Sequence, residues 1–324
     1  MNFFGEPQPH GGGAESSNET INAVGPEQWE EFVRWIDPLR DSSEANAALQ
    51  EFQRRHQLQS HSPLPLETRV GERRVAGAVM MLLGARVAAL AGVRAVDNHT
   101  LSAVNLLNRL VSEVRARGVV QIQAILDGTD SVATEIVQLA GFVPLAELQQ
   151  VVLMLGKPST DLQQPPAMVG LLANLHWVPA KEIPRPKMAQ LLAHTFIETL
   201  DCPALNGLRS PDEVLDGFLD GQALEEQPAW WVLASQDKLI GCVLVNRLPS
   251  GASELVYMGL TPTSRGRGYG KLLLEQGIAA VRGLGSEMFI AAVDCANWPA
   301  IRLYMQAGFQ EHARVQAWFY RPQG

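Results

Sequence analysis

Residues 259–294, GLTPTSRGRGYGKLLLEQGIAAVRGLGSEMFIAAVD, decide the fold because they have a diverged copy earlier in the chain. The copy is GVRAVDNHTLSAVNLLNRLVSEVRARGVVQIQAILD at residues 92–127, and it aligns without a gap at an offset of 167 (259 − 92). The same offset places the Ala-Gly-Phe triplet of 307–309 on the identical triplet at 140–142. A shared strand–helix–strand–helix pattern predicts that one domain has been duplicated.

Length and composition suit two globular domains. The chain has 324 residues, 46% of them hydrophobic and 19% charged, and a domain holds about 150 residues. We expect a flexible tail at 1–25, a first domain at 26–155, a polar and proline-rich linker at 156–170, and a second domain at 171–324. Strands followed by alternating helices and strands predict an α/β fold with a mixed sheet in each domain.

Charge and cysteine content exclude several classes of function. Lys and Arg number 26 against 34 Asp and Glu, a net charge of −8, which argues against nucleic acid as a partner. The three cysteines are scattered and form neither a zinc motif nor a disulfide framework. We therefore expect no metal, a cytoplasmic location and a monomer or homodimer. The N-terminus lacks the basic and apolar regions of a signal peptide.

One apolar stretch, residues 75–93, has two interpretations. About 20 apolar residues can span a membrane as a helix. Arg86 lies within the stretch and would cost at least ~2.5–3.5 kcal/mol near the bilayer centre. We expect instead two buried strands joined at Gly84, and no membrane as a partner.

The spacing of apolar residues predicts the remaining elements. The second half is expected to contain helices at 186–200, after Ser210, up to Arg282 and at 297–306, and strands at 229–235, 239–248, 253–260 and 288–293, with a final strand pair from 309. In the first half, residues 26–57 are expected to be helical, with Trp29, Phe32, Val33 and Ile36 on one face.

The segment Arg265-Gly266-Arg267-Gly268-Tyr269-Gly270-Lys271 carries the strongest chemical signal. Its glycines allow a tight turn and a close approach of the backbone to a ligand. Free N–H groups at the start of the following helix form an anion site, so the loop is expected to cradle a pyrophosphate. The spacing fits neither the P-loop nor the dinucleotide-binding fingerprint.

These residues resemble the GNAT superfamily of acyl-CoA N-acyltransferases. R-x-x-G-x-G at 265–270 resembles the acyl-CoA loop of that family, and the pattern N-x-x-A-x-x-L-Y at 297–304, followed by Gly-Phe, resembles its second motif. The resemblance covers 171–324 directly and the first half only through the repeat. A tandem arrangement with one degenerate half is also similar to that of mycothiol synthases.

The resemblance implies a role for each matching position. Residues 265–271 would bind the pyrophosphate of acetyl-CoA, and the backbone of Met258 and Leu260 would pair with the pantetheine arm. Asn297 would contact the same arm, and it is also suited to cap a helix. Tyr304 would protonate the departing thiolate.

The base is harder to assign. An amine of pKa near ~10 is mostly protonated at neutral pH, so a group must accept its proton. Glu254 precedes the Arg-Gly-x-Gly loop by the same distance as the catalytic glutamate of the histone-acetyltransferase branch, which the segment resembles. Alternation along a strand would place Glu254, Val256, Met258 and Leu260 on one face. A water ordered by Glu254, or Asp294, is an alternative.

The first half has lost the motif. The offset places residues of other types on the chemical positions: Asn98 for Arg265, Leu101 for Gly268, Ala103 for Gly270, Val137 for Tyr304 and Val87 for Glu254. A leucine where phosphate must approach would block the site, so we expect this half not to bind acyl-CoA.

The sequence therefore predicts an N-acetyltransferase that moves the acetyl group of acetyl-CoA to a primary amine by direct attack. The acceptor would be a small-molecule or peptide amine. A non-catalytic acyl-CoA sensor and an interaction protein remain alternatives, as does a cysteinyl-sugar acceptor like that of mycothiol synthases.

Overall fold

The structure is a computed structural model that describes residues 19–38, 46, 50, 63–83, 86–156, 174–219, 223–248 and 250–320. The expected turn at Gly84 and nearly all of the expected linker lie outside these ranges, as do residues 1–18 of the expected tail. The rest of that tail differs from the prediction, because residues 19–23 form a strand on the edge of the sheet.

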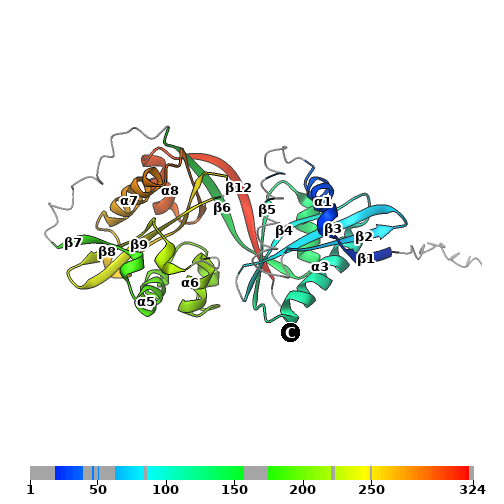
Figure 1. Cartoon of the computed structure of the whole chain (residues 1–324), viewed down its shortest axis with the longest axis horizontal. Helices are drawn as coiled ribbons and strands as arrows, with labels where there is room; N and C mark the ends of the chain where they lie inside the picture. The colour runs from blue at the N-terminus through cyan, green and yellow to red at the C-terminus, as the bar shows by residue number, and fades with distance from the viewer. Residues whose placement is uncertain are drawn as a thin grey trace, which may run out of the picture.

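Among the described residues the two halves share the same order of strands, and the second half has one more helix after its first strand (Figure 1). The first half contains β1 (Glu19–Ala23), α1 (Trp29–Ile36), β2 (Leu64–Val70), β3 (Arg73–Leu82), β4 (Val87–Ala95), α3 (Thr100–Ala116), β5 (Gln121–Asp127), α4 (Ser131–Leu139) and β6 (Phe142–Met154). The second half contains β7 (Leu175–Pro179), α5 (Arg185–Phe196), α6 (Pro211–Leu219), β8 (Trp230–Ser235), β9 (Lys238–Arg247), β10 (Ser253–Leu260), α7 (Tyr269–Gly283), β11 (Met288–Asp294), α8 (Trp298–Gln306) and β12 (Gln310–Tyr320).

The predicted α/β fold with a repeated domain is confirmed. At the offset of 167 the bounds of β11 coincide with those of β5, and the bounds of α8 coincide with those of α4. The apolar stretch 75–93 forms most of β3 and the greater part of β4, two antiparallel neighbours. Among the described residues, no helix is long and apolar enough to cross a membrane.

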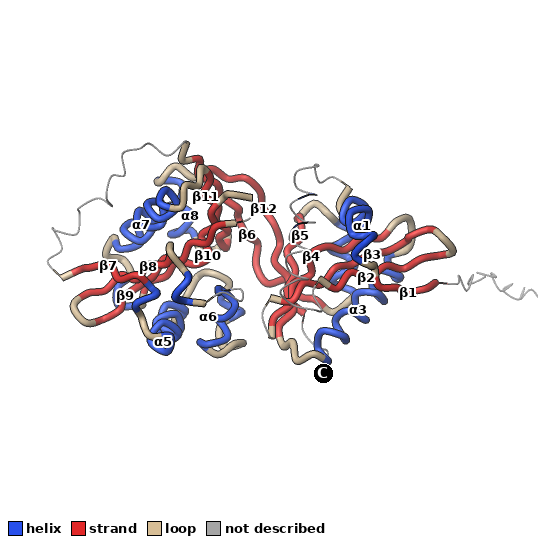
Figure 2. The backbone as a smooth tube through the Cα atoms, viewed as in Figure 1, coloured by secondary structure: helices blue, strands red, loops and turns tan. Residues whose placement is uncertain are grey.

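The two halves exchange their last strands within one sheet. The strand order is β1-β2-β3-β4-β5-β12-β6-β11-β10-β9-β8-β7, so β12 pairs with β5 of the first half and β6 pairs with β11 of the second. Figures 1 and 2 show β6 and β12 running side by side between the two lobes. The predicted final strand pair is wrong: one long strand takes its partners from the other half.

The register of the exchanged strands has an internal two-fold symmetry. Val143 pairs with Phe319 and Val152 pairs with Gln310, and adding or subtracting 167 converts one pair into the other. Likewise Asp127 pairs with Val315 while Asp294 pairs with Leu148. The repeat therefore extends from the sequence to the pairing between the halves.

Helices cover both faces of the sheet in the second half. Leu273, Leu274 and Val281 of α7 are buried against Phe289 of β11, and their separations of one, seven and eight residues place them on one apolar face of the helix. On the other face, Met188 and Leu192 of α5 and Leu215 of α6 pack on Trp230 of β8. The predicted helix 186–200 ends early at Phe196, and Glu198 has a left-handed φ of 54°.

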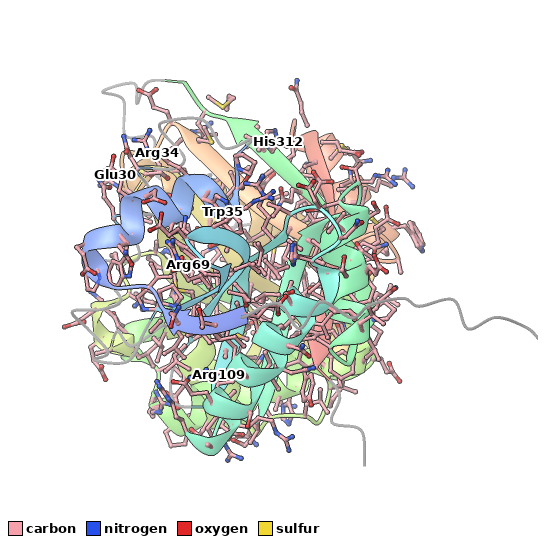
Figure 3. The ribbon with its side chains drawn as sticks, turned by 90° about the vertical axis from the view of Figure 1, so that its right-hand side faces the viewer. Glu30, Arg34, Trp35, Arg69, Arg109 and His312 are labelled. Atoms are coloured by element: carbon pink, nitrogen blue, oxygen red, sulfur yellow. The ribbon has the colours of Figure 1, made fainter. Side chains whose placement is uncertain are left out.

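Helix α1 covers the corresponding face of the first half. Trp29, Phe32 and Val33 are buried there, as predicted. Figure 3 shows Glu30 and Arg34 on the outer side of this helix, where they form an exposed ion pair of 3.0 Å. Buried Arg74 is held between Glu67 and Glu31 and lies 5.3 Å from the ring centroids of Phe32 and Trp35.

Candidate active site

The centre of the site is a gap between the parallel strands β10 and β11. In the described structure the two strands pair at Ser253 and Glu254 and then separate. Beyond that point β10 is paired on its β9 side alone, as far as Leu260. The gap is part of a cavity of about 690 Å³. An extended ligand can therefore pair with the open edge of β10 as an added strand.

A β-bulge at the mouth of this gap changes which side chains share a face. The register of β10 against β9 shifts between Leu255 and Tyr257. Leu255, Met258 and Leu260 consequently pack on the α7–α8 side of the sheet. Glu254 points to the opposite side, so the expectation that it shares a face with Met258 and Leu260 is wrong, because the bulge inserts one residue into the alternation.

The glycine loop has the geometry expected of an anion site. Gly266 and Gly268 have φ of +71° and +81°, a region that costs other residues about 1–2 kcal/mol. Within the described part of the chain, the backbone N–H groups of residues 266–270 have no acceptor. They lie at the N-terminus of α7, where the helix dipole favours negative charge. Lys271 lines the cavity and lies 3.8 Å from Glu275.

The side chain of Arg265 was expected to help bind the pyrophosphate, but in the structure it donates hydrogen bonds to backbone carbonyls. Its guanidinium donates to the carbonyl oxygens of Thr195 at 2.8 Å, Glu198 at 3.0 Å and Leu260 at 3.1 Å. It thus satisfies carbonyls at and just beyond the C-terminus of α5, where a cation is favourable. The guanidinium holds the α5–α6 connection against the loop, and Arg267 and Lys271 are the cations of the loop that remain available.

Tyr304 and Asn297 line the same cavity as the loop and the β10 edge. Tyr304 is 6% exposed, and in the described structure its hydroxyl has no hydrogen-bond partner. Burial, together with the charge of Asp201, raises the pKa of Tyr304 above its usual range, so the phenol stays protonated at neutral pH. Asn297 caps α8, since its side chain accepts from the N–H of Ala300 at 3.4 Å.

Glu254 borders a separate cavity of about 720 Å³ on the other side of the sheet, together with Gln150, Val152 and Ile290. Ala292 of β11 lines both this cavity and the one that contains Tyr304. Burial raises the pKa of Glu254, which moves this carboxylate towards the range of an effective base. The structure therefore does not bring Glu254 into one chamber with Tyr304 but places it across the β10–β11 gap.

A pair of aspartates near the site was missed as a pair by sequence reasoning. Asp201 accepts from the N–H of Asp294 at 3.0 Å, and Asp294 accepts from the N–H of Cys202 at 3.1 Å. Burial raises the pKa of Asp201, and the charge of Asp294 adds to this effect. Asp201 also lines the cavity of Tyr304. A chain separation of 93 residues gives no sequence signal for this contact.

The remaining base candidate, Asp294, has a structural task. Its Oδ1 accepts from the N–H of Ala296 at 2.8 Å. Asp127, its counterpart in the first half, accepts from the N–H of Thr129 at the same distance. An aspartate at this position therefore shapes the turn after the strand in both halves, as its presence in both halves suggested.

Comparison with known proteins agrees with this geometry. Residues 194–309 match the family described as Acetyltransferase (GNAT) family. This segment contains the open edge of β10, the loop and Tyr304. Residues 194–309 are therefore similar to the acetyltransferase domain of the GNAT family.

Relatives with this domain are similar in parts of the sequence or in the fold. A mycothiol acetyltransferase of Geodermatophilus obscurus is 33% identical over 70 residues, which is 22% of this chain and 23% of the relative. The chain thus matches less than a quarter of the length of that curated relative.

Two solved structures extend the likeness to both halves. A GCN5-related N-acetyltransferase from Sphaerobacter thermophilus has a TM-score of 0.67 and 15% identity, with 94% of this chain and 97% of that chain covered. A tandem GNAT protein from the clavulanic acid biosynthesis pathway has a TM-score of 0.58 and 15% identity, with 94% and 100% covered. At this identity the likeness establishes the fold, which is a tandem pair of GNAT-like domains.

The GNAT-like first half differs at the positions that form the gap and the loop. Its parallel pair, β4 and β5, stays paired through Leu90 and Ala124, so the strands separate later than β10 and β11 do. Helix α3 begins at Thr100, whereas the offset from the start of α7 would place its start at residue 102. The first turn of α3 thus occupies the place that the glycine loop has in the second half. Leu101, at the position of Gly268, is 70% exposed in this turn.

Proposed function

We propose that this chain is an acetyl-CoA-dependent N-acetyltransferase that acts on a primary amine, with its active site in the second half. The observation that supports this most is the cavity between β10 and β11. It combines the free N–H groups of residues 266–270, the open edge of β10 and the buried hydroxyl of Tyr304. These are an anion cradle, an edge for an extended arm and a proton donor, in one space.

The residues around the cavity fit acetyl-CoA. The N–H groups of the loop would bind the pyrophosphate, with Arg267 and Lys271 adding positive charge. The backbone of Met258 and Leu260 would pair with the pantetheine arm, and Asn297 lies beside the same space. The first half has a helical turn where the cradle would be, so we expect one acetyl-CoA per chain.

The reaction follows from the placement of two proton-carrying groups. The nitrogen lone pair of a neutral amine attacks the thioester carbonyl carbon, and the C–S bond breaks. Tyr304 donates its proton to the departing sulfur. Glu254 accepts the proton of the amine through an ordered water, since it lies across the β10–β11 gap. Backbone N–H groups of β10 beyond Glu254, the last residue that pairs with β11, would polarise the thioester carbonyl.

Calorimetric titration of acetyl-CoA, followed by measurement of CoA release with a panel of amines, tests this proposal. We expect one binding site, and CoA release that depends on the amine and is lost in Tyr304→Phe. The panel should include a cysteinyl-sugar amine, the acceptor implied by the resemblance to mycothiol synthases. Two binding sites would contradict the assignment of a degenerate half. Binding without release from any amine would favour a sensor, and the absence of binding would remove the proposal.

A further inference from the structure

A further cavity, distinct from the one that Glu254 borders, opens beside the acetyl-CoA cavity, beneath the connection between α5 and α6. It has a volume of about 480 Å³. Its aromatic wall is formed by Tyr257 between Phe196 and Phe218, at ring-centroid distances of 5.0 and 5.3 Å. Asp201 and Val256 line this α5–α6 cavity and also the acetyl-CoA cavity. Because Val256 is the bulge residue at the start of the open β10 edge, the two cavities meet where that edge begins.

The α5–α6 cavity contains a guanidinium that no carboxylate contacts directly in the described structure. Arg209 lines it and is half-buried, and burial lowers the pKa of Arg209, although the charge of Glu213 opposes this shift. In the described structure it makes no ion pair and no hydrogen bond through its side chain. Desolvating a charge without a directly bound counter-ion is unfavourable, so this arginine is suited to receive an anion from a ligand.

The nearest carboxylate, Glu213, is held by other groups. One of its oxygens accepts from the N–H of Ser210 at 2.8 Å and from the Ser210 hydroxyl at 3.0 Å. Its other oxygen lies 2.7 Å from the guanidinium of Arg86, which comes from the first half. Glu213 therefore caps α6 and joins the halves, and the guanidinium of Arg209 stays available to the cavity.

A carboxylate lies on the wall that this cavity shares with the acetyl-CoA cavity. Asp201 uses one oxygen to accept from the N–H of Asp294, and the rest of its carboxylate has no hydrogen-bond donor in the described residues. Its position on the wall shared by both cavities places negative charge where an amine would meet the acyl group. The cavity thus presents a cation at Arg209 and an anion at Asp201, with aromatic rings along one wall.

We propose that the α5–α6 cavity is the acceptor site and that it selects an amine which also carries a carboxylate. The carboxylate of the acceptor binds Arg209, whose planar fork suits bidentate pairing. The amino group lies at the Asp201 end, facing the acetyl-CoA cavity, and the body of the acceptor lies along Phe196, Tyr257 and Phe218. This inference rests on the proposed function and specifies its substrate class.

Matched pairs of amines that differ by one carboxylate test the inference. CoA release from acetyl-CoA is measured with phenylalanine against phenethylamine, 4-aminobutyrate against propylamine, and 6-aminohexanoate against pentylamine. A charge-assisted pair should favour the best amino acid over its partner by about 10- to 100-fold in kcat/KM. Arg209→Gln should remove that preference and leave the turnover of the simple amine within about threefold. Arg209→Lys, which keeps the charge, should retain part of it.

Arg185→Gln is the matched control. Arg185 lies on α5 and pairs with Asp216 of α6 at 2.6 Å, but it does not line the α5–α6 cavity. Arg185→Gln removes the same positive charge from the neighbourhood of the cavity. Because an exposed ion pair contributes little to stability, this variant should stay folded and keep the preference for the amine that carries a carboxylate. A preference equally reduced by Arg185→Gln and Arg209→Gln would reflect net charge and overturn the inference.

The outcomes separate this inference from the proposed function. Turnover of simple amines with no preference in any pair, or a preference that Arg209→Gln leaves intact, overturns the inference alone. If no amine releases CoA, the same amino acids are titrated into the CoA-saturated protein by calorimetry. Binding that Arg209→Gln abolishes then supports the acceptor cavity although the transferase reaction fails, and no binding overturns both.

Discussion

Replacing Gly268 tests whether the left-handed loop is the acetyl-CoA cradle. Gly268 has φ of +81°, and a Cβ built on it meets nothing within 4 Å. Gly268→Ala therefore introduces backbone strain without a clash, at a cost of about 1–2 kcal/mol. In the unbound variant the loop can relax to relieve this strain. Binding of acetyl-CoA then requires the loop to return to the strained conformation. We expect acetyl-CoA to bind about 5- to 30-fold more weakly, the equivalent of that strain.

Gly268→Leu should have a larger effect than Gly268→Ala. It adds the side chain that occupies the equivalent position in the first half, Leu101, and places it beside the free N–H groups of the loop. The N–H donors and the pyrophosphate could then no longer meet. We expect no measurable heat of acetyl-CoA binding in Gly268→Leu, with a folded protein by far-UV circular dichroism.

The chain supplies a matched control for the strain. Gly251, in the turn before β10, has φ of +88° and also has open space at its Cβ position, but it lies outside the cavity. Gly251→Ala should reduce the free energy of unfolding by about 1–2 kcal/mol, measured by urea denaturation, with the affinity for acetyl-CoA unchanged. Equal loss of affinity in Gly251→Ala, or an unchanged affinity in Gly268→Leu, would refute the assignment of the loop.

Three further predictions concern single side chains. Tyr304→Phe should lower kcat by about 10²- to 10⁴-fold, the range of general acid–base catalysis, while calorimetry gives an acetyl-CoA affinity within about twofold of the wild type. For Glu254, burial raises the carboxyl pKa above its ordinary value of 4.5, so the rate with an acceptor of low amine pKa should fall as the pH drops through that raised pKa. Glu254→Gln should remove this limb from the pH–rate profile, and an identical limb in the variant would exclude Glu254 as the base. Arg265→Ala leaves the carbonyls of Thr195, Glu198 and Leu260 without their donor, so the free energy of unfolding should fall by about 1–3 kcal/mol, and an unchanged urea midpoint would contradict its clamping role.

The sequence predicted what depends on local pattern. The spacing of apolar residues predicted a strand at 288–293 and a helix at 297–306, each within one residue of β11 and α8, and the gapless repeat predicted the matching elements of the first half. The glycines of 266–270 predicted the loop, since only that residue type adopts the observed φ without strain. Asn297 was expected to cap a helix and does so.

Other features depend on contacts between distant residues. The bulge at Val256 has no glycine or other marker in the sequence, and it reversed the face assigned to Glu254. In the folded chain the guanidinium N–H groups of Arg265 donate to carbonyls at the end of α5, although the loop motif alone suggested that they bind phosphate. The exchange of β6 and β12 could not be read from the repeat, because each strand has the same pattern whichever half it pairs with.

The exchanged strands give the first half a structural role that does not depend on binding acetyl-CoA. Without the first half, β11 would lose β6, its antiparallel neighbour, and an unpaired edge at this position invites aggregation. Without the second half, β5 would lose β12 in the same way. A truncation between the halves would therefore damage whichever piece remained. The first half can change at the positions that correspond to the glycine loop and Tyr304 as long as it offers β6 in register, so the second half carries a permanently attached partner, like a dimer that cannot dissociate.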